Sequence, residues 1–357
     1  MNASSGVGAS PRLALATNNG DIGGGEVMLL NIAEALREIG IVPVVITPSS
    51  PDELAREAAE RGFETVVLSA SSRPAYMAAL ATSRLRHRTV PLWCNGLVPS
   101  VATAGLGPRI VHLHVVPTER QRHLLRPACF GAQRVLVPSH DMAAQLPMST
   151  TVVENWTVDL PVLPRRTATT GPLRLGFLGR HSRDKGLDVL LRALAEVPEI
   201  DGREVRLVLA GDARFGSDDD AQAITAAAAP VEHRLDRLGW VSREDFFSQI
   251  DLAVFPSVAR ETFGLVAAEA MASGVPFVIS DNGALCEVVG PDHPWIARTS
   301  DASDLARVMT AALKATGTPQ SDASCRAARR RWEEHFSPLA GTRRVAALLR
   351  TIDKRKA

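Results

Sequence analysis

Two glutamates lie eight positions apart in the segment "ARETFGLVAAEAMASGVP", residues 259–276, in which most other side chains are small or apolar. Helix-forming Leu, Ala and Met follow Gly264, and Gly-Val-Pro at 274–276 supplies a helix stop. The sequence therefore predicts a helix that begins near Gly264. Glu261 then lies in the loop before the helix and Glu269 near its middle, and neither is followed by a lysine or arginine within the segment.

A helix start of this kind is suited to an anion that is flanked by hydroxyl groups. Unpaired N–H groups and the positive end of the helix dipole attract phosphate, and glycine lets a ligand approach the backbone. A nucleoside-diphosphate sugar carries hydroxyls on both sides of its pyrophosphate, and carboxylates accept hydrogen bonds from hydroxyls. Glu261 and Glu269 match such a molecule. The alternative is that Glu261 is an exposed acid that favours the helix dipole, and that Glu269 lies on a partly exposed face.

A second candidate group lies in "GRHSRDKG", residues 179–186, which follows the apolar run "LRLGFL". Arg180 and Lys185 are five positions apart on a loop that enters a helix, so both could reach one pyrophosphate. Arginine offers a planar fork of donors and lysine a compact charge, and together they could stabilise a diphosphate leaving group without a metal. The alternative is an exposed basic loop.

An acidic run, Asp218 to Asp220, is the one segment that resembles a metal-binding Asp-x-Asp motif. It follows a Gly-Ser pair and precedes an Ala-rich stretch that predicts a helix over 221–233. Acidic residues favour a helix start, which explains the run without a metal. We therefore predict no metal site.

The chain alternates short β-branched or Leu-rich runs with amphipathic Ala-rich stretches, the pattern of parallel sheets covered by helices. This pattern breaks in a Pro- and Thr-rich segment over 160–173 and then restarts. We predict two Rossmann-like domains, one over 1–162 and one over 163–335. A C-terminal helix over 336–357 is expected to pack back on the N-terminal domain.

The composition is that of a globular protein, with 45% hydrophobic and 22% charged residues and a formal net charge of +1. Such a balance carries no signature of nucleic-acid binding. The four cysteines form no Cys-x-x-Cys pair, which favours neither a zinc ribbon nor a disulfide framework and fits a cytoplasmic location. No leader pattern and no apolar run of membrane-spanning length is expected.

At this point the sequence resembles the family 4 retaining glycosyltransferases of the GT-B fold. Glu261 and Glu269 form an E-x7-E spacing inside S-x3-E-T-F-G-L-x3-E-A-M-A-x-G-x-P, which looks like the family signature. Three other segments are similar to family motifs and occur in the expected order: "GRHSRDKG", "VRLVLAGD" and "LGWVSREDFFSQIDLAVFPS". The resemblance covers the whole C-terminal domain.

The resemblance implies an α/β fold with two Rossmann-like domains that face a central cleft. It implies that the domain over 1–162 binds the acceptor and that the domain over 163–335 binds the nucleotide-sugar. It implies a metal-independent hexosyl- or related transferase, without a cofactor, that moves a sugar from a nucleoside-diphosphate sugar to an acceptor. The acceptor could be a polysaccharide, a lipid-linked glycan or a small natural product of a bacterium. Arg180, Lys185, Glu261 and His114 are the implied catalytic residues. The implied donor-binding residues are Gly179, Gly211, Phe263, Gly264, Leu265 and Glu269.

The N-terminal half is matched more loosely. By resemblance, Gly23, Gly24 and Gly25 form a loop that closes over the donor phosphate and the acceptor; the alternative is a tight strand-to-helix turn. His114 and His112 lie on one face of a strand, and His114 is implied to contact the donor sugar. The alternative for both histidines is a structural role in the core.

The sequence departs from the family pattern at two places, and its N-terminal half carries two basic clusters. Trp156 stands where the family has glycine, and Asn282-Gly283-Ala284 replaces a glycine pair. The clusters at 84–88 and 118–127 are read as solvated faces, while contact with the inner face of the plasma membrane stays open. A GT-B phosphorylase, a sugar-nucleotide epimerase, a non-catalytic binding protein and a dehydrogenase are the alternative functions.

Overall fold

A computed structural model describes residues 10–162, 171–212 and 217–353. The chain divides into unit 1, Met1–Asn155 with Pro338–Ala357, and unit 2, Trp156–Ser337. The boundaries predicted from the sequence, after 162 and after 335, lie a few residues from these. Residues 163–170 of the expected linker lie outside the described part of the chain.

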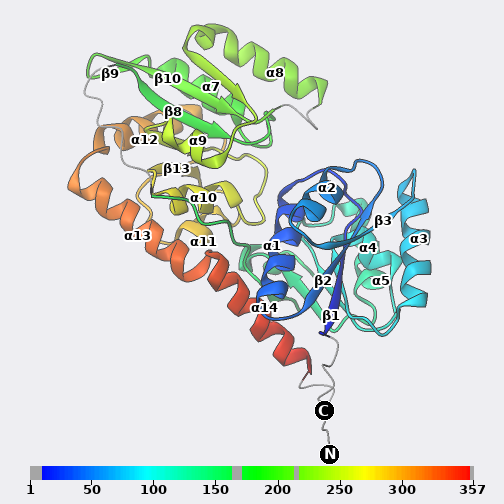
Figure 1. Cartoon of the computed structure of the whole chain (residues 1–357). Coiled ribbons are helices and arrows are strands. Elements are labelled where there is room, and N and C mark those ends of the chain that lie inside the picture. The colour runs from blue at the N-terminus through cyan, green and yellow to red at the C-terminus, as the bar shows by residue number, and fades with distance from the viewer. Residues whose placement is uncertain (1–9, 163–170, 213–216, 354–357) are drawn as a thin grey trace, which may run out of the picture. The chain divides into compact units, whose positions relative to one another are not determined.

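Unit 1 is built on one parallel sheet (Figure 1). In chain order its strands are β1 (Arg12–Ala16), β2 (Val42–Pro48), β3 (Glu64–Leu68), β4 (Leu92–Asn95), β5 (Arg109–His112), β6 (Arg134–Val137) and β7 (Thr151–Val152). Their order across the sheet is β3-β2-β1-β4-β5-β6-β7. The chain builds outward from β1 in one direction and then, from β4, in the other, so the topology reverses between β1 and β4.

The helices of unit 1 come from both ends of the chain. They are α1 (Gly24–Glu38), α2 (Glu53–Glu60), α3 (Arg73–Arg86), α4 (Leu97–Ala102), the 3₁₀ helix η1 (Glu119–Leu124), α5 (Leu125–Cys129), α6 (His140–Ala144) and α14 (Pro338–Asp353). α14 packs against α1, as Figure 1 shows, and its Val345 is fully buried. Thr342 of α14 also donates to Glu38 Oε2 of α1 at 2.7 Å.

Unit 2 contains a second, mostly parallel sheet, ordered β11-β10-β8-β12-β13-β14, with β9 antiparallel to β10. Its strands are β8 (Leu173–Leu178), β9 (Glu199–Ile200), β10 (Arg203–Ala210), β11 (Leu235–Gly239), β12 (Leu252–Phe255), β13 (Phe277–Ser280) and β14 (Ile296–Ala297). Here the topology reverses between β8 and β12. The predicted fold class, two parallel-sheet α/β domains, is confirmed.

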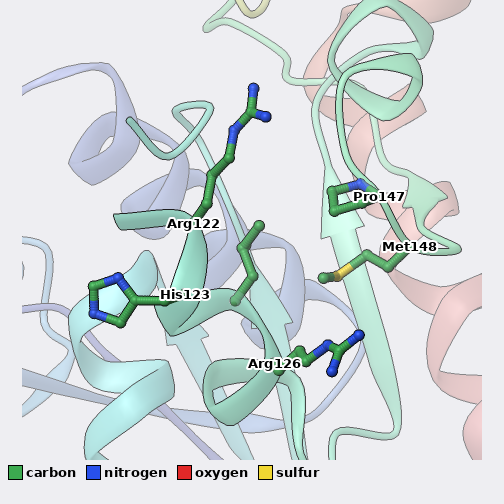
Figure 2. A pocket seen from close by; sticks show the side chains of 6 residues that line it. Arg122, His123, Arg126, Pro147 and Met148 are labelled. Carbon is green, nitrogen blue, oxygen red and sulfur yellow. The ribbon is translucent and has the colours of Figure 1, made fainter. Parts of the chain in front are cut away.

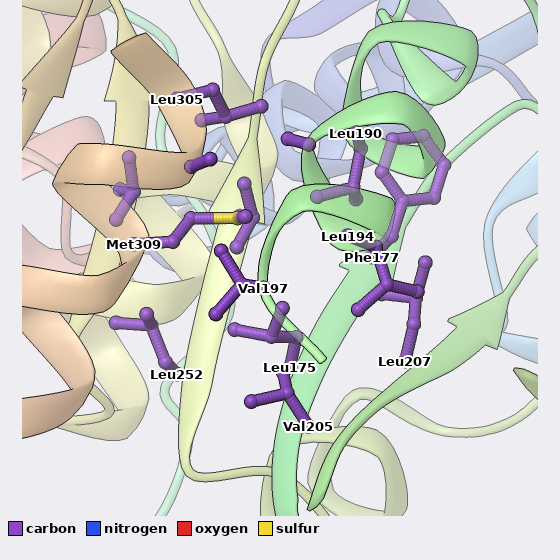
Figure 3. Close-up of a cluster of buried hydrophobic side chains, with 14 of the residues drawn as sticks. Leu175, Phe177, Leu190, Leu194, Val197, Val205, Leu207, Leu252, Leu305 and Met309 are labelled. Atoms are coloured by element: carbon purple, nitrogen blue, oxygen red, sulfur yellow. The ribbon is translucent and has the colours of Figure 1, made fainter. Parts of the chain in front are cut away.

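The sheet of unit 2 is buried on both faces, because alternate side chains of its strands point to opposite sides. The helices that cover it are α7 (Leu187–Glu196), α8 (Asp218–Ala228), the 3₁₀ helix η2 (Ala229–Arg234), α9 (Arg243–Ser248), α10 (Leu265–Ser273), α11 (Leu285–Val289), α12 (Ala302–Ala315) and α13 (Pro319–His335). Leu175 and Phe177 of β8 pack with Leu190 of α7 and Met309 of α12 (Figure 3). On the other face, the strands pack with α9, α10, α11 and α13.

The helix predicted over 221–233 is wrong in its bounds. α8 begins three residues earlier, at Asp218, because Ser217 caps it and accepts from Asp220 N at 3.1 Å. It ends at Ala228, where the chain continues as the 3₁₀ helix η2. The acidic run is therefore the first turn of α8.

The reading of residues 84–88 as a solvated face is wrong for Arg84, which is buried. Its guanidinium donates to the carbonyl oxygens of Leu106 at 2.7 Å and Pro108 at 2.9 Å. Arg109 is used in the same way, donating to the carbonyls of Ser100 and Ala128. Each of these buried guanidinium groups therefore donates hydrogen bonds to several loop carbonyls inside unit 1. A lysine, which has a single nitrogen, could not reproduce this geometry.

Candidate functional site

The chemistry-bearing residues of unit 2 gather where its strand order reverses. In open α/β sheets, ligands bind outside the carboxyl ends of the strands at this point. The loops that leave β8 (179–186) and β12 (256–264) meet there, since the carbonyl of Asp184 accepts from Val258 N at 2.8 Å and from Ala259 N at 2.9 Å. Gly186 allows the contact: a Cβ on it would lie 1.9 Å from the carbonyl oxygen of Pro256.

Lys185 and Glu261, one from each loop, form an ion pair. Lys185 Nζ donates to Glu261 Oε1 over 2.5 Å, and Ser257 Oγ donates to the same oxygen over 2.7 Å. The lysine side chain is 29% exposed and the glutamate 14%. Glu261 therefore has a basic partner in the protein, which the sequence segment did not reveal because Lys185 lies 76 positions away.

Glu261 is also fixed through its backbone. Its carbonyl accepts from Ala284 N at 2.9 Å, and a Cβ on Gly283 would lie 2.4 Å from that carbonyl oxygen. Gly283 has a φ of 57°, in the left-handed region that favours glycine. The Asn-Gly-Ala departure from the family pattern thus forms the loop against which Glu261 rests.

Arg180 is exposed, and its side chain makes no ion pair or hydrogen bond within the described residues. It leaves β8 directly after Gly179, which packs against Gly211 at the end of β10. A Cβ on Gly211 would lie 2.1 Å from the carbonyl oxygen of Gly179, and Gly211 has a φ of 104°. Glycine at 211 therefore lets the two strand ends approach each other.

α10 begins at Leu265, with Gly264 as its N-cap at a φ of 98°. The predicted helix start near Gly264 is confirmed. No side chain caps this end within the described residues, so its first N–H groups lack a side-chain acceptor. Phe263 is buried and Leu265 is partly buried, which anchors the turn on both sides.

Glu269 is buried in the middle of α10, with 8% of its surface exposed. Burial raises the pKa of its carboxyl, and Arg243 opposes that shift. Arg243 Nε donates to Glu269 Oε2 over 3.0 Å. Both glutamates therefore have a basic partner in the protein, although neither partner lies within the segment 259–276. Arg243 was missed because it lies 26 positions before its partner, and no local spacing connects the two.

In unit 1 the predicted residues also meet at the topological reversal, between β1 and β4. Asn95, the last residue of β4, donates through Nδ2 to the carbonyl of Gly25 over 3.0 Å. Its Oδ1 lies 2.6 Å from His114 Nε2. A Cβ on Gly25 would come within 3.4 Å of the His114 ring. The structure thus brings Gly25 and His114 together through Asn95, a residue that the sequence analysis did not select.

This arrangement fixes the protonation of His114. Because the Asn95 amide nitrogen donates to Gly25, its oxygen faces the imidazole, and His114 Nε2 must carry the hydrogen. Burial lowers the pKa of His114 to about 4. His114 is therefore a neutral hydrogen-bonding group at ordinary pH rather than a proton donor.

His112 is fully buried, with its ring centroid 4.1 Å from that of His114. Its Nδ1 accepts from Trp93 Nε1 over 3.3 Å, and burial lowers its pKa well below the ordinary range. These contacts give His112 the structural role that the sequence analysis held as the alternative for it.

The N-terminus of α1 differs from that of α10 because it already holds a carboxylate. Gly23 is the N-cap and Gly24 the first helical residue. Glu26 Oε2 accepts from Gly23 N at 3.3 Å, and Thr17 Oγ1 donates to Glu26 Oε1 at 3.1 Å. A negative group at this position repels phosphate and suits a hydroxyl.

A cavity of about 320 Å³ lies elsewhere in unit 1, between the basic segment 118–127 and residues 147–148 (Figure 2). Leu125, Pro147 and Met148 form its apolar walls, and Arg122 and Arg126 point away from each other at two ends. The residues that line it are Arg122, His123, Leu125, Arg126, Pro147 and Met148. It is basic at its edges and apolar between them.

The described residues contain neither a cluster of metal ligands nor a membrane-spanning helix. No group of three or more His, Cys, Asp or Glu side chains in that part of the chain could hold a metal ion. None of the helices there combines the length and apolar character that crossing a membrane requires. All four cysteines are free thiols.

Comparison with known proteins finds similar glycosyltransferases. Residues 172–315 match the family model of group 1 glycosyl transferases. A D-inositol 3-phosphate glycosyltransferase of Stackebrandtia nassauensis is 32% identical over 199 residues, 52% of this chain and 44% of that protein. A phosphatidyl-myo-inositol mannosyltransferase of Mycobacterium leprae is 26% identical over 329 residues, 82% of this chain and 84% of that protein. Several other curated relatives are matched over only 27% to 32% of their length.

Among solved structures, Anabaena HepE in complex with UDP has a TM-score of 0.79 and 20% identity, covering 96% of this chain and 100% of that one. The same protein has also been solved with UDP-glucose, and that structure has a TM-score of 0.78. At this identity the likeness concerns the fold alone. The chain has the GT-B fold of these proteins, and residues 172–315, which carry Arg180, Lys185, Glu261 and Glu269, are similar to the group 1 glycosyltransferases.

Proposed function

We propose that this protein is a retaining family 4 glycosyltransferase that moves a sugar from a nucleoside-diphosphate sugar to an acceptor hydroxyl. The observation that carries the proposal is the Lys185–Glu261 pair, held at the topological reversal of unit 2 beside the open helix start at Gly264. This point offers cations, helix N–H groups and a carboxylate to one molecule. A nucleoside-diphosphate sugar requires all three.

Each side chain then has a separate task. Lys185 exchanges Glu261 for the donor diphosphate, where Arg180 adds its planar fork. Glu261, released from the lysine, accepts hydrogen bonds from the sugar hydroxyls. The N–H groups at the start of α10 face the phosphates, and Glu269 accepts from the ribose hydroxyls.

The reaction breaks the bond between the anomeric carbon and the diphosphate oxygen and forms a bond from that carbon to the acceptor oxygen. The acceptor proton passes to the departing phosphate, so no protein nucleophile is needed. The two basic residues stabilise the charge that develops on the leaving group. His114, neutral and with its Nε2 hydrogen bonded to Asn95, can only accept a hydrogen bond from a sugar hydroxyl, and it transfers no proton.

UDP-sugars are the first donors to test, since the similar HepE structures contain UDP and UDP-glucose. We expect nucleoside diphosphate to be released only when an acceptor is present. Release without an acceptor would favour an epimerase, and dependence on inorganic phosphate a phosphorylase. Activity that persists after chelation would support the proposed metal independence.

Substitution of either basic residue tests the assignment of the leaving-group site. Removing one such contact costs about 3 to 4 kcal/mol of barrier, so Lys185→Ala or Arg180→Ala should lower kcat by roughly two to three orders of magnitude. Arg192→Ala is the control, because Arg192 is an exposed residue of α7 that pairs with Asp188. Near wild-type turnover in both active-site variants would reject the proposal.

We further propose that the basic cavity in unit 1 attaches the protein peripherally to anionic membranes. Arg122 and Arg126 flank an apolar slot, which suits a phosphate group joined to an apolar chain. Sedimentation with anionic vesicles, compared with zwitterionic ones, should show binding that Arg122→Gln/Arg126→Gln abolishes. Equal binding of the double variant would contradict this role.

A further inference from the structure

Glu269 depends on one neighbour for its charge. The carboxylate lies in a helix whose residues from Ala267 to Ser273 are all buried. Within the described residues, Arg243 is the only side chain that bonds to it. A buried carboxylate that loses its partner is strongly destabilised, because neither water nor another charge replaces the lost interaction.

Arg243 is held in place by its own element. It is the first residue of α9, directly after the N-cap Ser242, whose hydroxyl accepts from Asp245 N at 3.0 Å. Phe246 and Phe247 of α9 are almost fully buried and fix this short helix in the core. The first turn of α9 is therefore fixed, and it holds the guanidinium of Arg243 next to Glu269.

The bond between Arg243 and Glu269 occupies only one donor atom of the guanidinium and one oxygen of the carboxylate. Arg243 reaches Glu269 through Nε alone, and its Nη1 and Nη2 make no hydrogen bond within the described residues. One carboxylate oxygen, Oε2, receives that bond, so Oε1 stays available as an acceptor. A third of the Arg243 side chain is exposed, against a tenth of Glu269, so the pair borders solvent on the arginine side.

We infer that Arg243 is a positioning residue for nucleotide recognition: it holds the carboxylate of Glu269 so that Oε1 accepts the ribose hydroxyls of the donor. This inference rests on the proposed function, which assigns the ribose to Glu269. It adds a residue that lies outside the E-x7-E spacing and that acts through another side chain. Arg243 thereby sets how strongly the protein prefers a ribonucleotide to its 2′,3′-dideoxy form.

The test is a ratio of two dissociation constants. We would measure by calorimetry the affinity of whichever of UDP, GDP and ADP binds best, and of its 2′,3′-dideoxy form. Hydrogen bonds to a charged group contribute about 1.5 to 3 kcal/mol, so the wild-type ratio should be at least about tenfold. Arg243→Met and Glu269→Gln should each bring the ratio close to one, chiefly by weakening the ribonucleotide.

Three further variants exclude a merely structural effect. Arg243→Lys, which keeps the charge, should restore part of the ratio. The double variant Arg243→Met/Glu269→Gln should be no weaker than Glu269→Gln alone, because residues that act as a unit are not additive. Arg192→Met is the matched control, since Arg192 also pairs with a buried acid, Asp188 on α7, and should leave the ratio unchanged.

A wild-type ratio in Arg243→Met, or an equal loss of both nucleotides, would overturn the inference while leaving the proposed function intact. If Arg243→Met does not fold, Arg243→Gln takes its place, and a wild-type ratio in that variant would overturn the inference. A wild-type protein that binds none of the three nucleotides would overturn the inference and the proposed function together.

Discussion

A lysine that is paired with a carboxylate in the free protein has to change partner when a diphosphate binds. Under the proposed function Lys185 is in this situation, because its Nζ lies 2.5 Å from Glu261 Oε1. The pair keeps the lysine in place and lowers the cost of holding a positive charge at a partly buried position. It also reduces the affinity for any anion that competes with Glu261.

Glu261→Gln should therefore separate nucleotide binding from turnover. The variant frees Lys185, so the dissociation constant of the nucleoside diphosphate should fall, by up to about fivefold for a partly exposed pair. The same change would weaken the proposed contact with the sugar, so kcat should fall by about two orders of magnitude. Titration calorimetry and steady-state kinetics would measure the two effects. Weaker nucleotide binding in the variant would contradict the exchange of partners.

His114 makes the stability of the protein depend on pH. Its pKa of about 4 in the folded state lies below the ordinary value of 6.5, so between these values the unfolded chain binds more protons. The stability that neutral His114 contributes is complete above about pH 6.5 and is lost progressively as the pH falls toward 4.

Denaturant unfolding at pH 7 and pH 5 should show this loss. His114→Gln should remove about 1 to 2 kcal/mol of the difference in free energy of unfolding between the two pH values. His112 and His293 also have lowered pKa values and keep part of the slope in the variant. A slope that is unchanged in His114→Gln would show that the ring is not buried as described.

At the scale of elements, the site depends on turns that only glycine can form. Gly264 combines a φ of 98° with a close neighbour, since a Cβ on it would lie 2.5 Å from Leu285 Cδ2. Gly202 has a φ of 75° and open space around it. The two positions separate the cost of the backbone conformation from that of the packing.

Gly202→Ala should cost about 1 to 2 kcal/mol of stability, the price of a left-handed backbone alone. Gly264→Ala should cost more, because Leu285 has to move, and should also weaken nucleotide binding by displacing the start of α10. Thermal unfolding with and without nucleotide would compare them. Equal losses of stability, with nucleotide affinity intact in both, would argue against a tight helix start.

The sequence predicted those features that depend on residues next to each other in the chain, and it did not predict contacts made across the fold. The start of α10 was found because glycine, helix-forming residues and a stop follow one another directly. Arg243 and Asn95 were missed because each meets its partner through the fold, across 26 and 19 positions respectively. Sequence spacing reports neighbours within an element, and contacts between strand ends appear only once the strand order is known.

At the scale of the whole molecule, unit 1 is assembled from two distant parts of the chain. Its sheet lies within Met1–Asn155, while α14 comes from Pro338–Asp353. α14 buries Ala340, Val345, Leu348 and Ile352 in its packing, and Arg344 pairs with Glu154 at 3.1 Å. Unit 2 is continuous in sequence.

Truncation after Ser337 should therefore affect the two units differently. Removing α14 exposes apolar surface on α1, so unit 1 should lose its protection from proteolysis. Unit 2 should remain folded and keep its nucleotide-dependent thermal shift, which corresponds to about 2.7 kcal/mol at a ligand concentration of 100 Kd. The result would contradict this account if unit 1 stayed protected or if unit 2 lost its nucleotide response.

The late position of α14 also sets an order of events on the ribosome. Domains generally fold as they emerge, N-terminal first. Here the strands of unit 1 leave the ribosome early but lack the helix that covers α1 until the whole of unit 2 has been synthesised. The first part to be made is thus the last to be completed, and α1 is the surface that a chaperone would have to shield during that interval.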